Sequence, residues 1–457
     1  MVWLRELPWR EPDAVLAAWG HAPWCAFLDS GGVLEERSRW HFFCHAPRHV
    51  LSVSAGHVTM DGRDLGALSP RQVLALLREL CPPSQAMELA DSGVPFCGGL
   101  VGFAGYGFGL ALEAVPSIHL AQAGVPDMAV ALYDHAYVWD RQEKRCYVSG
   151  FSSVSDMEAG CVAAWHALPE QVAPAPVCPA LRLESDQSEA AYCQAVARAR
   201  DLIAAGDIFQ VNITGRYTAR LPEGVAGVDL YRRLRLQAPA PFGAYLSCGA
   251  GFSLLSCSPE RFLSVSAQGD VTSRPIKGTA PRGADAAQDE VLAGLLAADE
   301  KECAENLMIV DLMRHDIGRV ARIGSMRVKD FLKVERFAHV HHLVSEVRGT
   351  LLPERDAFDL LGATLPPGSV TGAPKHRALE IIDALEASAR GAYCGTVFRI
   401  GVDGSMDSAV IIRSFECAGR VMRIGVGGGI TILSDPQKEY EEMRLKLAPF
   451  AAFAEGV

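Results

Sequence analysis

The pattern of apolar and polar positions divides the chain into a strand-rich first part and a second part that mixes strands with helices. Within residues 1–150, short apolar runs bounded by turn residues predict a mostly antiparallel sheet. Helical spacing predicts a helix there over Pro70–Leu80, and a second helix just after this region over residues 152–168. The strand-like runs are Trp24–Leu28, Trp40–Cys44, His49–Val53, Met128–Leu132, Ala136–Trp139 and Arg145–Val148.

A proline-rich stretch separates the two parts. Gln171–Pro179 reads Gln-Val-Ala-Pro-Ala-Pro-Val-Cys-Pro, a composition typical of a linker. We therefore predict an N-terminal region over residues 1–175 and a second domain over residues 185–457.

The second part begins with a predicted helix, Ser188–Ala205, whose apolar residues recur at helical spacing until Gly206 ends it. Strands and helices follow without strict alternation, which indicates an α+β fold class. Strands are expected at 208–218, 242–247, 252–257, 261–266, 393–401, 407–416 and 420–426, and helices at 287–297, 301–313, 374–387 and from Pro436 to Phe453.

Composition and charge exclude several classes of protein. The 457 residues are 49% apolar and 21% charged, as in an ordinary globular protein. The formal charge of −11 argues against nucleic-acid binding. Thirteen scattered cysteines without a Cys-x-x-Cys pair fit reduced thiols in a cytoplasmic protein. No apolar run approaches ~18 residues and the N-terminus is charged, so neither a membrane span nor a signal peptide is expected.

The segment Arg274–Gly283 holds a single lysine in an unusual backbone context. Lys277 lies between Pro275 and Pro281 and directly before Gly278. A stiff backbone with permissive glycines suits a side chain held at a fixed angle beside a ligand. A solvated lysine at a strand end would show the same pattern, so this segment alone decides nothing.

Other ionisable residues suggest a metal site and an anion site. Glu302 and Glu305 are three residues apart, as are Glu439 and Glu442, so each pair would share one helix face. Brought together they would form an all-oxygen site for Mg²⁺, although two solvated helix faces would look the same. Arg413, after an apolar run, could bind a carboxylate bidentately or simply reach solvent.

Glycine runs and histidines add two further candidates. The run Gly425–Ile430 is placed between a strand and the last helix, where bare N–H groups could approach an anion. The stretch Gly98–Gly109 lacks the dinucleotide-binding spacing and is expected to be a tightly packed turn. Of His339, His341 and His342, the adjacent pair would point to opposite faces of a strand, so one histidine contacting a substrate fits better than a zinc site.

Together these segments resemble the chorismate-utilising enzymes, the family of anthranilate, aminodeoxychorismate, isochorismate and salicylate synthases. The resemblance is strong over about residues 185–455 and looser before them. It implies an anthranilate-synthase-like fold, with large antiparallel β-sheets packed as a sandwich and flanked by helices. The matching stretches are Ser258–Phe262, Arg274–Thr279, Ala304–Arg314, His341–Ser345, Gly368–Lys375, Met406–Ser408, Gly427–Gly429 and Glu439–Glu442.

Two residues indicate the branch of the family. Anthranilate synthases have alanine where this chain has Lys277, whereas a lysine there marks aminodeoxychorismate synthase component I, on the route to 4-aminobenzoate and folate. Isochorismate and salicylate synthases have a water-activating lysine at the position of Gln210, and an amide cannot act as that base. The resemblance therefore implies amination of chorismate through a covalent Lys277 intermediate, whose amine must be neutral to attack. Anthranilate synthase component I and a non-catalytic binding subunit are the alternatives.

The resemblance also implies roles for single residues. Glu260 would donate a proton to the leaving hydroxyl. Glu305 and Glu442 would hold Mg²⁺, with Glu302 and Glu439 close behind them. The residues expected to bind substrate are Thr279, His342, Ser369, Tyr393, Arg413, Gly427, Gly428, Gly429 and Gln210.

The chain lacks a glutaminase motif, so the resemblance implies a separate glutamine amidotransferase subunit that supplies ammonia. A tryptophan pocket of the family would include Ser30. Several positions depart from the family pattern: His315 replaces asparagine, Pro367 replaces glycine, Phe398-Arg399 replaces Gly-Tyr, and Gly107 stands where the family often has an acid. We expect these departures to alter packing around the site rather than the class of reaction.

Overall fold

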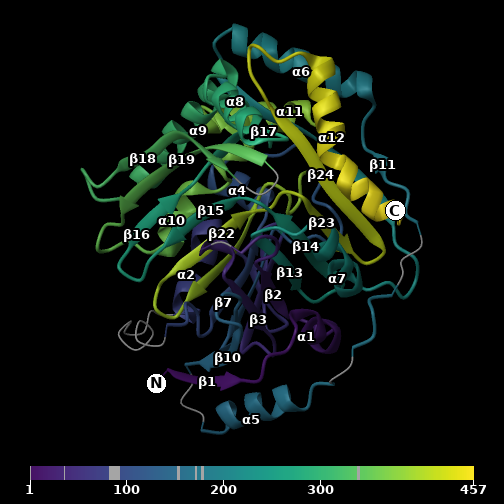
Figure 1. Ribbon diagram of the computed structural model, residues 1–457, viewed down its shortest axis with the longest axis vertical. Helices are drawn as coiled ribbons and strands as arrows, with labels where there is room; N and C mark the ends of the chain where they lie inside the picture. The colour runs from purple at the N-terminus through teal and green to yellow at the C-terminus, as the bar shows by residue number, and fades with distance from the viewer. Residues whose placement is uncertain are drawn as a thin grey trace.

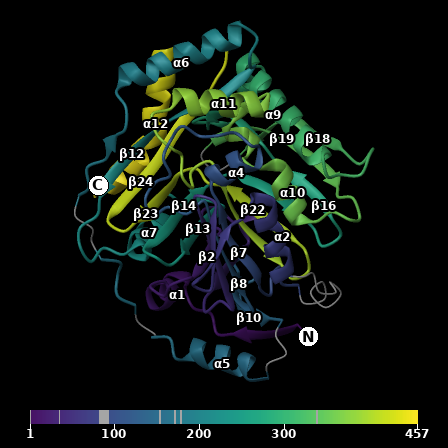
Figure 2. The ribbon, with the colours of Figure 1, turned by 180° about the vertical axis from the view of Figure 1, so that it is seen from behind.

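The computed structural model describes residues 2–34, 36–81, 93–151, 155–169, 172–176, 180–336 and 340–456. These residues form two 12-stranded sheets with helices around them (Figures 1 and 2). The strand pairs are antiparallel, as in β2–β3 and β7–β8. This confirms the predicted α+β class and the large antiparallel sheets.

The first sheet combines strands from both parts of the chain, from the N-terminal strand at one edge to the strand that follows the predicted linker at the other. Its order is β1 (Trp3–Leu7), β10 (Arg145–Gly150), β9 (His135–Asp140), β3 (Trp40–Cys44), β2 (Ala26–Asp29), β13 (Phe242–Ser247), β14 (Phe252–Ser258), β23 (Ser414–Ala418), β24 (Val421–Ile430), β12 (Gln210–Arg220) and β11 (Glu184–Ser185), with β20 (Gly372–Ala373) beside β12.

The second sheet likewise combines early and late strands. Its order is β17 (Ile276–Pro281), β19 (Val340–Thr350), β16 (Asp270–Ser273), β15 (Arg261–Val265), β22 (Met406–Val410), β21 (Thr396–Gly401), β7 (Gly99–Ala104), β8 (Met128–Tyr133), β4 (His49–Ser54), β5 (His57–Met60) and β6 (Arg63–Ala67), with β18 (Arg327–Arg336) beside β19.

Both sheets therefore run across the predicted boundary near residues 175–185. β2 pairs with β13 in the first sheet, and β7 pairs with β21 in the second. The rings of Phe103 on β7 and Phe252 on β14 lie 5.5 Å apart, which places a shared apolar layer between the sheets. Each sheet is continuous across the predicted boundary. The division into two domains therefore stays a prediction.

The helices lie outside the sheets, and their ends carry the expected signals. Asp299 accepts a hydrogen bond from the Glu302 N–H, and Asp435 accepts bonds from the N–H groups of Gln437 and Lys438. Among the described residues, no helix is long and apolar enough to cross a membrane. The helices are α1 (Pro12–Trp19), α2 (Pro70–Leu80), α4 (Tyr106–Leu112), α5 (Ser155–His166), α6 (Glu189–Ala204), α7 (Gly227–Gln237), α8 (Ala286–Ala297), α9 (Glu300–Gly318), α10 (Ala357–Thr364), α11 (Lys375–Leu385) and α12 (Pro436–Glu455), with short 3₁₀ turns η1 (Glu36–Ser38) and η2 (Gly368–Val370).

Two glycine-rich predictions were wrong. Gly98–Gly109 is not a packed turn, since it contains β7 and the start of α4. A Cβ added at Gly99 would lie 2.2 Å from the Ile400 carbonyl oxygen, so the missing side chain lets two strands approach. The run Gly425–Ile430 lies within β24 rather than after it.

The single strand expected over residues 407–416 was also wrong. The structure has β22 and β23, which belong to different sheets. Residues 411–413 carry the chain from one sheet to the other, and Arg413 adopts a left-handed backbone with φ of 52°. Apolar periodicity continues through this crossing because both sheets bury their strands, so the pattern hides the break.

Candidate active site

Lys277 lies on β17 at a bulge in the pairing with β19. Lys277 faces Leu343 and Thr279 faces His342, with the register shift at Gly278 between them. Gly278 has φ of 77°, and an added Cβ would lie 3.1 Å from Glu302 Oε2. The sequence-based expectation of a permissive backbone beside Lys277 is therefore confirmed at Gly278.

The Lys277 side chain reaches β24 and α9, which lie near β17 in the upper part of Figure 1. Its Nζ lies 3.8 Å from Glu305 Oε2, and only 16% of the side chain is exposed. A Cβ added at Gly429 would lie 3.5 Å from that Nζ, 3.2 Å from Glu305 Oε2 and 2.9 Å from Gln210 Nε2. Gly429 therefore leaves open a space on which an amine, a carboxylate and an amide converge.

Glu260 lies just before β15, and its backbone carbonyl accepts a hydrogen bond from the N–H of Val410. Burial raises the pKa of Glu260, while a hydrogen bond with Ser369 and the charge of Lys277 oppose the rise. A carboxyl group with a raised pKa can hold a proton near neutrality and donate it. Ser369 and Lys277 thus lie close enough to affect Glu260, while the predicted roles of these residues stay predictions.

Four predicted carboxylates gather where α9 approaches α12. Lys301 Nζ lies 4.0 Å from Glu305 Oε1 and 3.2 Å from Glu439 Oε1, so it joins the two helices. A Cβ added at Gly428 would lie 3.3 Å from Glu439 Oε2 and 4.0 Å from Glu442 Oε1. The two pairs of glutamates therefore do not lie on separate solvated faces.

The raised pKa values of Glu302 and Glu305 indicate that additional positive charge would stabilise their ionised forms. Burial raises the pKa of Glu302, and the charge of Glu305 raises it further. Burial also raises the pKa of Glu305; Lys277 and Lys301 oppose the rise, whereas Glu439 and Glu442 add to it. Carboxyl groups that repel one another in a partly buried site favour a bound cation.

The four carboxylates are donors of the type that Mg²⁺ uses, but the described residues hold no group of three or more acidic, histidine or cysteine side chains placed to hold a metal ion, so Mg²⁺ binding stays a prediction. Mg²⁺ commonly uses one or two protein carboxylates and completes its shell with water and substrate oxygens. The buried Gln210 Oε1 has no hydrogen-bond partner in the described part of the chain, so it can accept a hydrogen bond from a bound ligand.

Thr279 and His342, which are predicted to contact the substrate ring, lie beside Lys277 on the paired strands β17 and β19. His342 Nδ1 lies 3.0 Å from Thr279 Oγ1. Burial lowers the pKa of His342, so the imidazole is neutral. His341 points to the opposite face, where its Nε2 lies 2.9 Å from Asp289 Oδ1, so the predicted opposition of the pair is confirmed. His339 lies outside the described residues.

Three other candidates have different surroundings. Tyr393 is buried against Gly425, where an added Cβ would lie 2.3 Å from its ring, so its role toward a substrate stays a prediction. Gly427 packs against β12, and its carbonyl oxygen accepts a hydrogen bond from Lys446 at 3.1 Å. Arg413 is exposed, its charge lowers the pKa of His342, and no carboxylate of the described residues affects its own pKa. Arg413 is therefore available to an anion.

Sequence reasoning missed two lysines. Lys301 contacts Glu305 and Glu439, and Lys446 Nζ lies 2.7 Å from Glu442 Oε1. Although burial opposes it, Lys446 lowers the pKa of Glu442. Both lysines are four residues from a predicted glutamate, so the i,i+4 spacing was a usable signal.

The departures from the family pattern lie mostly away from Lys277. Pro367 precedes η2, which carries Ser369, so this substitution does adjoin the site. His315 is exposed and lines a separate groove with Phe331 and Lys375. Phe398 and Arg399 line another cavity, between the two sheets. Among these four residues, the expectation of altered packing around the site therefore fits only Pro367.

Comparisons with known proteins agree on the family. Residues 29–452 match the family model described as chorismate binding enzyme. The chain is 39% identical over 446 residues to aminodeoxychorismate synthase component 1 of Klebsiella aerogenes, covering 96% of this chain and 95% of that one. It is 38% identical over 412 residues to anthranilate synthase component 1 of Thermus thermophilus, covering 89% and 87%.

A solved structure shows the same architecture. Anthranilate synthase component I of Streptococcus pneumoniae superposes with a TM-score of 0.80 at 31% sequence identity, covering 92% of this chain and 94% of that one. The predicted anthranilate-synthase-like fold is thereby confirmed. Because the family model matches nearly the whole of this chain, the chain belongs to the chorismate binding enzyme family.

Proposed function

We propose that this protein transfers ammonia to chorismate and forms 4-amino-4-deoxychorismate, for the synthesis of 4-aminobenzoate and folate. The observation that carries the proposal is the amine of Lys277 at 3.8 Å from Glu305, directed at the space that Gly429 leaves open. The relative from Klebsiella aerogenes that bears the name aminodeoxychorismate synthase component 1 supports this reading.

Lys277 is the nucleophile of the proposed reaction. The lone pair of its Nζ forms a bond to C2 of the chorismate ring, both conjugated ring double bonds shift, and the C4–O bond breaks. Ammonia then forms a bond at C4, both double bonds shift back, the C2–Nζ bond breaks, and the new C4 ammonium returns a proton to the Glu260 carboxylate. This divides one difficult substitution into two easier steps and returns Lys277 unchanged.

Glu260 is the proton donor of this scheme. Its raised pKa keeps the carboxyl group protonated until the C4 hydroxyl leaves as water. Ser369 orients Glu260 through a hydrogen bond, and the exposed guanidinium of Arg413 would bind a substrate carboxylate. The remaining candidates, Thr279 and His342, would contact the ring.

Glu302, Glu305, Glu439 and Glu442 would hold Mg²⁺. When bound, the ion would orient a substrate carboxylate and offset its negative charge. Lys301 and Lys446 offset part of the carboxylate charge themselves, through the ion pairs with Glu439 and Glu442.

Ammonia would come from a glutamine amidotransferase partner, as the words "component 1" in the relatives' names suggest. We place the protein in the cytoplasm, in keeping with its cysteines, since the 12 described ones are all free. Tryptophan binding near Ser30 stays an expectation.

Anthranilate synthase activity is the second candidate, since relatives of similar identity bear that name. The two activities are separated by incubating the purified chain with chorismate, Mg²⁺ and ammonium, with and without an aminodeoxychorismate lyase. We expect 4-aminobenzoate only when the lyase is present, detected by mass and fluorescence. Fluorescent anthranilate without the lyase would overturn the proposal.

Two variants test whether product formation depends on the amine of Lys277. Lys277→Ala should abolish product formation, because no other amine replaces the nucleophile. Lys329→Ala, at an exposed position on β18, is the matched control and should retain activity. Equal activity of Lys277→Ala and wild type would remove the covalent step from the mechanism.

A further inference from the structure

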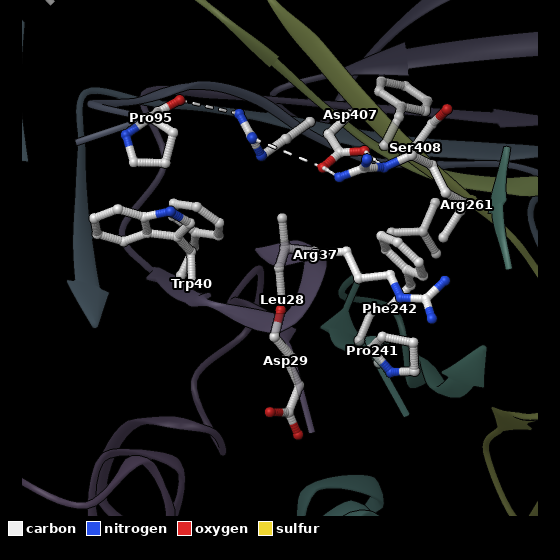
Figure 3. Close-up of a pocket in the computed structure, with 18 residues that line it drawn as sticks. Leu28, Asp29, Arg37, Trp40, Pro95, Pro241, Phe242, Arg261, Asp407 and Ser408 are labelled. Atoms are coloured by element: carbon white, nitrogen blue, oxygen red, sulfur yellow. Dashed lines mark hydrogen bonds and ion pairs between the residues drawn. The ribbon is translucent and has the colours of Figure 1, made fainter. Parts of the chain in front are cut away.

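A cavity of about 390 Å³ lies where α2 packs against α10, beside the residues that follow α9 (Figure 2). It joins a helix of the N-terminal region to two helices of the second part of the chain. Neither Lys277 nor the four glutamates of the candidate active site line it. It is also separate from the cavity between the sheets, which Ser30 and Trp40 line (Figure 3). Neither the proposed reaction nor the expected tryptophan pocket therefore accounts for it.

Four arginine side chains line this cavity together with a single carboxylate. Arg71 and Arg78 come from α2, Arg319 follows α9 directly, and Arg355 precedes α10. The carboxylate is that of Asp359, in the first turn of α10. The lining therefore carries an excess of positive charge, and these like charges repel one another.

The Asp359 carboxylate is already engaged through both oxygens. Oδ1 accepts a hydrogen bond from Arg355 Nη1 at 3.1 Å. Oδ2 lies 3.1 Å from Arg78 Nη2 and accepts a hydrogen bond from the Asp356 N–H at 3.2 Å. The Arg78 guanidinium also donates two hydrogen bonds to the Asp356 carboxylate, of 2.6 and 3.0 Å. Arg78 is thus fully paired, and no carboxylate in the lining remains for a further guanidinium.

The three other guanidinium groups keep free N–H donors. Arg71 has no hydrogen-bond or ion-pair partner in the part of the chain that the structure describes. Arg319 uses only Nη1, which lies 3.2 Å from the Ala363 carbonyl oxygen and 3.4 Å from Glu113 Oε1. Arg355 likewise uses only Nη1. Because each guanidinium carries five N–H donors, most donors of these three groups are without an acceptor among the described residues.

The rest of the wall is mostly apolar. Leu74 and Ala75 come from α2, and Phe358 and Gly362 come from α10. The Arg78 guanidinium lies 5.7 Å from the Phe358 ring centroid, a contact that helps to fix its plane. A Cβ added at Gly362 would lie 3.1 Å from Leu74 Cδ1, so the two helices approach closely there. The cavity volume lies within the range of small-molecule sites, so an organic body can accompany a charged group.

A phosphate group matches these donors better than a carboxylate does. A carboxylate offers one negative charge and two oxygens, whereas a phosphate monoester offers close to two charges and three strong acceptor oxygens. Arginine is also the side chain whose planar fork binds phosphate bidentately. We propose that this cavity binds a phosphate dianion, free or as the monoester of a small molecule, between Arg71, Arg319 and Arg355. The inference is independent of the proposed function, because it uses none of the residues assigned to catalysis.

Calorimetric titration of the full chain tests it at pH 8, where phosphate is mostly a dianion, and at constant ionic strength. The probes are inorganic phosphate, phenyl phosphate and acetate. We expect both phosphates to bind in a 1:1 complex and acetate to bind at least about tenfold more weakly. Tighter binding of phenyl phosphate than of inorganic phosphate would assign the cavity to a monoester, and equal affinities would assign it to the free anion.

Arg71→Gln should weaken phosphate binding by about ten- to a hundredfold, since charge-assisted hydrogen bonds are lost. The fold should survive, because Arg71 is exposed and has no partner among the described residues. Arg319→Gln should act in the same direction. The matched control is Arg198→Gln on α6, an exposed arginine outside the cavity, which should bind phosphate as wild type does.

Arg413→Gln separates this cavity from the candidate active site, because it removes the guanidinium that is available to an anion there. Its affinity for phosphate should equal that of wild type. Loss of binding in Arg413→Gln would show that phosphate occupies the active site and would overturn the inference. Unchanged binding in Arg71→Gln, no binding by either phosphate, or acetate that binds as tightly as phosphate would overturn it as well.

Discussion

Lys277 Nζ lies 3.8 Å from Glu305 Oε2, although one residue is on β17 and the other on α9. This contact joins the proposed nucleophile to the proposed metal ligands. It also explains the glycine opposite, because any side chain at position 429 would enter the space that both groups face.

Gly429→Ala tests that space directly. The added methyl group would lie 2.9 Å from Gln210 Nε2 and 3.2 Å from Glu305 Oε2, so we expect kcat/KM to fall by at least about a hundredfold through displacement of these groups. The fold should survive, since the nearest atoms are ends of flexible side chains.

The matched control is Gly294→Ala on α8, where an added Cβ meets nothing within 4 Å. That variant should keep full activity and gain about 1 kcal/mol of stability from the higher helix propensity of alanine. Full activity of Gly429→Ala would contradict the assignment of the open space to the substrate.

Glu260→Gln should lower kcat by about 10²- to 10⁴-fold, as expected when a general acid is removed. In wild type, kcat/KM should fall as the pH rises through the raised pKa of Glu260, because only the protonated form donates. This alkaline limb should be absent from the profile of Glu260→Gln, and it should persist in Glu354→Gln, at an exposed position.

The same carboxyl group links pH to stability. Because the folded state binds the Glu260 proton more tightly than the unfolded state, the free energy of unfolding falls as pH rises from the usual value of 4.5 through the raised pKa. Glu260→Gln should therefore gain stability relative to wild type at neutral pH, and the gain should shrink in acid. Denaturant unfolding at several pH values measures this difference, and a variant less stable than wild type at neutral pH would contradict it.

Lys375→Met should lower the free energy of unfolding by about 3–5 kcal/mol, since it leaves the buried carboxylate of Asp316 without its partner. The Lys375 ammonium contacts Asp316 and also donates to the Thr364 carbonyl at 2.8 Å. Adding Asp316→Asn to Lys375→Met should recover part of the loss, because the unpaired charge is removed. A double variant less stable than the single variant would show that the pair is not the cause.

His45 and His135 should make the protein sensitive to mild acid. Burial lowers the pKa of both imidazoles to about 4, and the charge of a protonated His135 adds to the lowering of the His45 pKa. The unfolded state binds their protons below pH 6.5 while the folded state does not, so stability falls as the pH drops from 6.5 towards 4. We expect a slope of about 1 kcal/mol per pH unit for each histidine.

His135→Phe should reduce that slope, because phenylalanine can keep the edge-on contact with the Tyr137 ring, whose centroid lies 5.6 Å away. His57→Phe, at an exposed position, should leave the slope unchanged. Urea unfolding between pH 5 and 7 measures both, and equal slopes in His135→Phe and wild type would assign the acid sensitivity to other groups.

Local elements were predictable where end signals and periodicity agree. The helix predicted over Pro70–Leu80 has those bounds in the structure, because Ser69 and Gln72 form a capping box and Pro70 occupies the first turn. The break between β22 and β23 was not predictable, since both flanking segments are apolar and the choice of sheet depends on distant partners.

The sequence by itself determined the family motifs, the lysine and carboxylates that carry the proposed chemistry, and most helices and strands, because these follow from residue type and local spacing. Only the tertiary structure decided that Lys277, Glu305, Gln210 and Gly429 surround one space, and that Arg399 belongs to a different cavity. The reason is that both sheets are assembled from strands far apart in the chain, and such pairings depend on packing between whole elements rather than on local pattern.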